Sequence, residues 1–172
     1  MGIFSDNPKD KPMHYGEISS VFMASTAAKG SISCYQAYLN HSGDKDLNKI
    51  LEALVDQAKL ESKELDALLI NNGITPTPTM PERPTVKLED IPAGARFTDP
   101  EIAIKIATDT SMSLVACSQA MAQSIREDIG ALFAKYHLTK AAQGIKILEM
   151  LKDKGWLITP PLQVNRPETA KV

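Results

Sequence analysis

The chain has 172 residues, 43% hydrophobic and 23% charged, which is enough to bury about two-thirds of its unfolded surface in one core. Its 19 Lys and Arg residues nearly balance its 21 Asp and Glu residues, giving a formal net charge of -2 without long runs of one sign. This balance argues against a nucleic-acid surface, and no apolar stretch approaches the roughly 20 residues of a membrane span. With no secretory leader pattern at its start and two cysteines inside helical patterns, the chain is expected to be soluble and cytoplasmic.

Two long helices are predicted in the first half of the chain. Apolar and small residues recur at spacings of three and four over residues 15–41 and again over residues 45–72. We expect Gly43 to end the first helix in a left-handed conformation, and Asp44 to cap the N-terminus of the second. Because the connection is so short, the two helices should form an antiparallel hairpin.

A second hairpin is predicted after a long connection. Residues 73–98 contain five prolines and should cross over from one end of the first hairpin to the other. The same periodicity then predicts helices over residues 99–123 and 125–154. Ser124 and Glu127 match a capping box at the start of the last helix.

These elements predict an all-α fold, a ferritin-like four-helix bundle with a long crossover between helices 2 and 3. The bundle should span residues 14–158, between an N-terminal arm (1–13) and a C-terminal tail (159–172). Small side chains occupy the middles of the first and third helices, residues 24–28 and 107–111. We expect them to allow a close approach of the two backbones.

The two hairpins resemble each other, with matched positions 82 or 83 residues apart. The matched pairs are Cys34 with Cys117, Asp46 with Asp128, and Gly73 with Gly155. The offset indicates an internal repeat, with chance similarity between amphipathic helices as the alternative. Antiparallel repeats would place the two cysteines roughly 18 Å apart, too far for a disulfide.

Several short motifs are distinctive in combination. They are Met13–Glu17, Tyr38–His41, Gly43–Leu47, Pro81–Pro84, Asp90–Phe97, Ser124–Asp128 and Lys154–Ile158. On these motifs, over about residues 7–164, the chain resembles a family of uncharacterised ferritin-like proteins from spore-forming bacteria, similar to spore coat protein F. The resemblance implies a ferritin-like fold and an association with the spore coat or sporulation, and it supplies no catalytic residue.

The sequence lacks the ligand pattern of a ferritin-like di-iron site, which needs two helices with a Glu and two with Glu-x-x-His. None of the three histidines has a Glu three positions before it, and Asp109 is the only acid inside the third helix. We therefore predict no catalytic residue, no metal and no cofactor. Two alternatives stay open: a metal held by Glu61 and Asp109, or one held by His14 with Glu17.

Glu61 is a carboxylate on the inward stripe of the second helix. An isolated carboxylate is costly there, so we expect a buried polar layer of Glu61, Gln143 and Tyr136. A solvated position at the rim and a ligand-binding role are the alternatives for Glu61. Asp109 should lie near Lys140 and form an ion pair with it.

The remaining histidines and cysteines have structural explanations. His14 and Glu17 can cap the first helix, and His41 at its C-terminus should be favoured in its positive form by the helix dipole. Cys34 and Cys117 are expected to act as small packing groups, since no basic cluster marks either thiol as activated.

The leading hypothesis is a non-enzymatic structural or protein-interaction module, associated with the spore coat or sporulation by resemblance. Self-association into a homo-oligomer is expected because long helices offer extended faces. The alternative is a divergent ferritin-like protein that binds a metal or a small molecule in its core.

Overall fold

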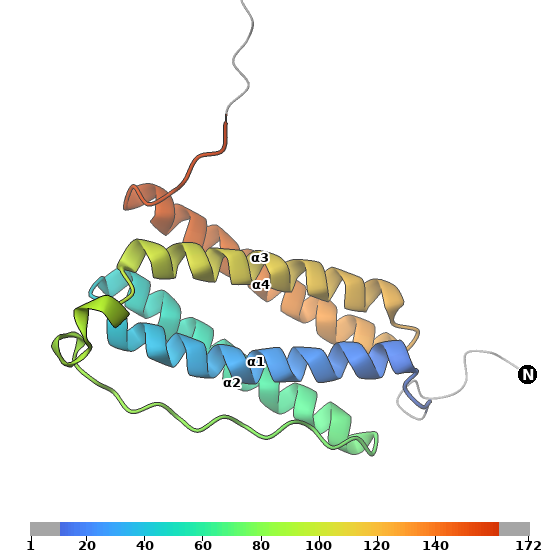
Figure 1. The fold of residues 1–172 in the computed structure, drawn as a ribbon. Coiled ribbons are helices and arrows are strands. Elements are labelled where there is room, and N and C mark those ends of the chain that lie inside the picture. The colour runs from blue at the N-terminus through green and yellow to red at the C-terminus, as the bar shows by residue number, and fades with distance from the viewer. Residues whose placement is uncertain (1–10, 162–172) are drawn as a thin grey trace, which may run out of the picture.

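The computed structural model describes residues 11–161, and within this range it is entirely helical apart from turns and extended connections (Figure 1). The elements are α1 (Tyr15–His41), α2 (Lys45–Asn71), the short 3-10 helices η2 (Leu88–Asp90) and η3 (Ala93–Ala95), α3 (Asp99–Gln123) and α4 (Glu127–Asp153). The all-α prediction with two paired helical hairpins is confirmed. None of the described helices is long and apolar enough to cross a membrane.

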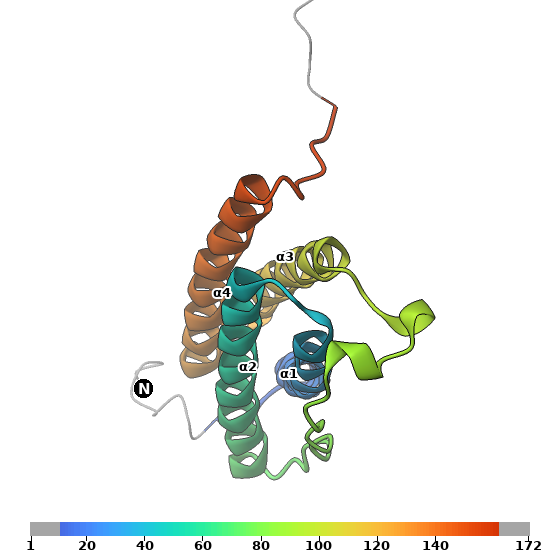
Figure 2. The same ribbon diagram turned by 90° about the vertical axis from the view of Figure 1, so that its left-hand side faces the viewer.

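Each hairpin is a closely packed antiparallel pair, α1 with α2 and α3 with α4 (Figure 1). The two hairpins contact each other less extensively, mainly through α1 against α3. Figure 2 shows α1 and α3 on one side of the molecule and α2 and α4 on the other. The ferritin-like assignment, the internal repeat and the division into arm, bundle and tail stay predictions, and residues 1–10 and 162–172 lie outside the described range.

The buried apolar residues form two clusters, one toward each end of the bundle. The first contains Leu51, Ile106 and Ile147, and the partly buried Trp156 packs against it. The second contains Leu65 and Phe133, and it packs toward the start of α1. The middle of the bundle, between these clusters, is where polar side chains enter the interior.

Helices α2 and α4 are followed by left-handed glycines, and α1 is not. Gly73 and Gly155 both adopt positive φ, 75° and 68°, directly after the C-cap residues Asn72 and Lys154. Gly43 does not. Helix α1 is capped instead by Ser42, which is extended and whose N–H donates to the Tyr38 carbonyl at 2.9 Å. The left-handed residue is unnecessary because the chain turns directly into the Asp44 cap of α2.

The predicted capping box at the start of α4 does not form. The Ser124 hydroxyl donates back to the Ala120 carbonyl at 2.7 Å, and α4 begins at Glu127. The Glu17 carboxylate of α1 takes over this role and accepts the N–H groups of Ile125 and Arg126 at 2.9 and 2.8 Å. The start of α4 is therefore capped by Glu17, a residue distant in sequence, and not by the local pair of Ser124 and Glu127.

The crossover runs along α1 from the end of α2 to the start of α3 (Figure 1). Lys29, a buried cation, pairs with Asp66 at 2.8 Å and donates to the Thr77 carbonyl of the crossover. At the other end, the Phe97 N–H donates to Nδ1 of His41 at 3.1 Å. His41 therefore anchors this end of the crossover through Nδ1.

Candidate functional site

Small side chains from the middles of α1 and α3, among them Thr110, line a cavity of about 590 Å³ between the hairpins, to which all four helices contribute. Ala24, Ala27 and Ala28 of α1 form part of its wall, and the large rings of Tyr35 and Phe133 also border it. Bulky residues at the ends and small ones in the middle leave the space unfilled, because packing distance is set by the largest side chains in contact.

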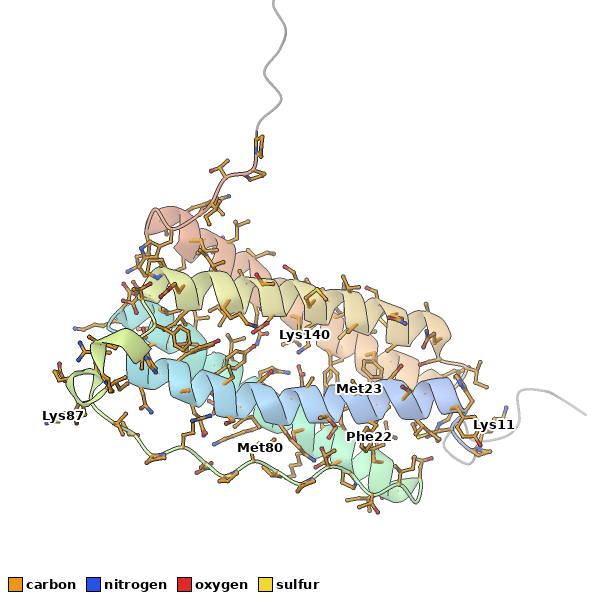
Figure 3. The ribbon with its side chains drawn as sticks, viewed as in Figure 1. Lys11, Phe22, Met23, Met80, Lys87 and Lys140 are labelled. Atoms are coloured by element: carbon orange, nitrogen blue, oxygen red, sulfur yellow. The ribbon has the colours of Figure 1, made fainter. Side chains whose placement is uncertain are left out.

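An ion pair forms the polar floor of the cavity. The buried Glu61 carboxylate accepts from Lys140 Nζ at 2.8 Å to each oxygen, and from the Gln57 amide at 3.0 Å. Only 17% of the Lys140 side chain is exposed, and Figure 3 shows it between the two hairpins. Lys140 thus pairs with Glu61 and not with Asp109, which bonds to Lys105 on its own helix.

Tyr136 and Gln143 also line this cavity, so the three residues of the predicted polar layer surround one space. The Tyr136 hydroxyl, however, donates to Glu64 at 2.7 Å and not to Glu61. Burial and the Glu64 carboxylate raise the Tyr136 pKa well above its usual value. Burial opposes ionisation of Glu64, but the bonds from Lys135 and Tyr136 outweigh it and lower the Glu64 pKa.

Two further lining residues have shifted pKa values. Burial, reinforced by the Asp109 carboxylate, raises the pKa of Tyr35 to about 12. Burial also raises the pKa of the Cys117 thiol, which is free, as is the half-buried Cys34. Neither the phenol nor the thiol is therefore activated as a nucleophile near neutral pH, in line with a packing role.

His14 and Glu17 form an N-terminal cap. His14 Nδ1 accepts the Gly16 N–H at 3.0 Å, and Glu17 accepts the His14 N–H at 3.1 Å. Glu17 is 1% exposed, and its oxygens are already bonded to three backbone N–H groups of two helix starts. Over residues 11–161, no group of three or more His, Cys, Asp or Glu side chains is placed to hold a metal ion.

Sequence reasoning missed Lys140 and Gln57 as partners of Glu61. Helical spacing could have indicated both, because Gln57 precedes Glu61 by four residues and Lys140 follows the inward Tyr136 by four, which places each pair on one helix face. The cavity itself has no such signal, since it depends on how far apart the hairpins pack.

Charge is divided between the two sides of the molecule. In α1 the charged side chains are Glu17 and Lys29, both buried, and α3 has none from Thr110 to Gln123. Helices α2 and α4 carry charged residues along their whole length. We call the exposed, uncharged residues on the α1 and α3 side the neutral face: Tyr15, Ser19, Met23, Ala27, Gly30, Ser111, Met112, Val115, Ala116, Ser118, Gln119 and Ala122.

Comparison with known proteins places this fold and sequence in a family. The model of a family described as "Protein of unknown function (DUF3231)" matches residues 1–168. The chain belongs to the DUF3231 family. The chain is also 46% identical over 170 residues, 99% of its length, to the whole of the uncharacterized protein YvdQ of Bacillus subtilis strain 168.

A solved structure has the same fold. A crystal structure described as a "putative spore coat protein" from Bacillus halodurans C-125 superposes with a TM-score of 0.91 at 43% sequence identity. The match covers 92% of this chain and all of that one. This agrees with the resemblance to spore-former proteins that the motifs indicate.

Proposed function

We propose that this DUF3231 protein is a spore-associated, non-enzymatic interaction module that assembles with further copies of itself through the neutral face. The association with spores is supported by the description of the Bacillus halodurans protein, at 43% identity. The mode of action is supported by the neutral face, which carries the proposal.

The neutral face has the composition of a protein interface. Met23 of α1 and Met112 and Val115 of α3 are each more than 60% exposed, with no exposed charge among them. Charged residues are depleted and Met is enriched at the centres of interfaces. In a twofold contact a surface meets its own copy, so any charge near the axis would face a like charge. A face without charge avoids this repulsion, which favours a second copy as the partner.

Self-association is tested by light scattering on a size-exclusion column with the variant Met112→Lys/Val115→Lys. We expect the unmodified chain to elute as a dimer or larger assembly, and the variant to shift at least tenfold toward monomer. Leu138→Lys on α4 is the control, because Leu138 is 71% exposed on the charged side. An unmodified chain that stays monomeric at high concentration would refute the proposed assembly.

The spore association has its own test. The tagged chain, produced in sporulating Bacillus subtilis, should be recovered in the coat extract of purified spores. Recovery only from the mother-cell or forespore lysate would contradict the assignment, whatever the oligomeric state.

A further inference from the structure

The cavity between the hairpins has features of a binding site that the assembly proposal does not use. Its volume of about 590 Å³ lies within the range of about 300–1,000 Å³ found for small-molecule sites. Its lining combines apolar side chains with hydroxyl and amide groups of both α1 and α3, and the exposed lining residues lie on these two helices, between which the cavity opens.

The cavity is elongated. Its lining residues extend from Gly16 to Tyr35 on α1, which at 1.5 Å per residue is about 28 Å. A space of this length suits an extended chain of methylene groups better than a compact ligand, which would fill only part of it.

The cavity is also electrically balanced. Among its lining residues, Glu61 and Lys140 are the charged side chains, and each is the other's partner. A charged ligand would have to separate this pair or remain without a counter-ion in a partly desolvated space, and both are costly. The polar groups available without breaking the pair include the amides of Gln119 and Gln143 and the hydroxyl of Ser113, which can donate and accept hydrogen bonds.

From these dimensions and this charge balance, we propose that the cavity binds an uncharged, single-chain amphiphile. Its apolar chain lies between α1 and α3, along Ala24, Ala28 and Ala120, and its hydroxyl or amide head group bonds near Gln143. Five residues of the neutral face also line the cavity, so the assembly surface borders its opening: Ser19, Met23, Ala27, Ala116 and Gln119. Met112 and Val115 lie on the neutral face outside the cavity lining, which allows assembly and ligand binding to be changed separately.

The test compares three probes with the same chain and different head charges: 1-decanol, decanoate and decyltrimethylammonium, each titrated calorimetrically below its aggregation concentration. We expect 1-decanol to bind at least tenfold more tightly than either charged probe. Shortening the alcohol should weaken binding by about three- to fourfold per methylene group. Equal binding of the three probes, tighter binding of a charged probe, or no binding of 1-decanol would overturn the proposal.

Two tryptophan variants locate the site. Ala116 and Ala122 are both exposed on α3, but only Ala116 lines the cavity. Ala116→Trp should fill the mouth and weaken 1-decanol binding at least tenfold, while Ala122→Trp should leave it within twofold. Ala27→Trp, on the α1 side of the mouth, gives a second blocking variant if Ala116→Trp is not folded by circular dichroism. Equal binding by the blocking and control variants would overturn the site.

A variant of the neutral face separates this inference from the assembly proposal. Met112→Lys/Val115→Lys should bind 1-decanol as tightly as the unmodified chain, even if it is monomeric. Loss of binding in this variant would contradict an amphiphile site that lies within one copy of the chain.

Discussion

Lys140 is the residue whose loss should disturb the interior most. It is the cation opposite the buried Glu61 carboxylate, so Lys140→Met leaves that carboxylate with only the Gln57 amide. Breaking a fully buried pair costs about 3–5 kcal/mol, and the opening of the cavity to water reduces this to about 2–3 kcal/mol. Urea unfolding should show this loss. Lys146→Met, an exposed site on the same helix, should change stability by less than about 0.5 kcal/mol. Equal effects of the two substitutions would contradict the role assigned to the pair.

The Asp44 carboxylate should make stability depend on acid pH. Its pKa is lowered first by the bond from Lys154, at 2.7 Å, and then by the N–H groups of Leu47 and Asp46. A carboxyl with a lower pKa in the folded than in the unfolded state stabilises the fold above the unfolded value, about 3.9. That stabilisation is lost as pH falls through the folded pKa.

The variant Asp44→Asn isolates this effect, because Asn is also a good N-cap residue. Between about pH 6 and about pH 3, the variant should lose less stability in urea unfolding than the unmodified chain. A parallel decline of the two proteins would show that other carboxyl groups control the acid response.

At the level of the helices, two glycines should respond in opposite directions to alanine. Gly155 has a φ of 68° after α4, so Gly155→Ala should destabilise the fold by about 1–2 kcal/mol. Gly30 lies inside α1 with open space where a Cβ would be, so Gly30→Ala should stabilise it by about 0.8–1 kcal/mol. Thermal unfolding measures both, and shifts of the same sign would contradict the helix-end assignment.

The helices were predictable because their signals are local. Periodicity of small and apolar residues, the Asp44 cap and the glycine stops each act within a few residues. The start of α4 was not predictable in this way, since its free N–H groups bond to Glu17, more than one hundred residues earlier in the chain. The predicted box would use the N–H groups of Ser124 and Glu127, whereas Glu17 accepts those of Ile125 and Arg126, and sequence alone does not place this distant carboxylate at the start of α4.

The candidate site was predictable only in part, for a related reason. The inward position of Glu61 follows from helix period, and its burial agrees with that expectation. Its pairing with Lys140, and the cavity beside them, depend on the distance and rotation between two hairpins. Small residues in α1 and α3 permit either close contact or an open space, so composition alone did not predict the cavity.

At the scale of the whole molecule, the division of charge predicts how assembly responds to salt. The neutral face has no exposed charge, so contact between two copies would form no ion pairs that salt could screen. Raising NaCl from about 0.05 to about 0.5 M, which shortens the Debye length from more than 10 Å to less than 5 Å, should leave the dimer dissociation constant unchanged or lower it. Sedimentation equilibrium measures this constant.

An increase of the dissociation constant with salt would point to a different assembly surface. The charged residues of α2 and α4 form exposed pairs such as Lys135 with Glu64, and an interface built from that side would weaken as salt rises. A dissociation constant that increases several-fold with salt would therefore place the contact on α2 and α4 and remove the neutral face as the assembly surface. Binding of 1-decanol in the cavity would remain a separate question, since an uncharged ligand beside the Glu61 and Lys140 pair is also insensitive to screening.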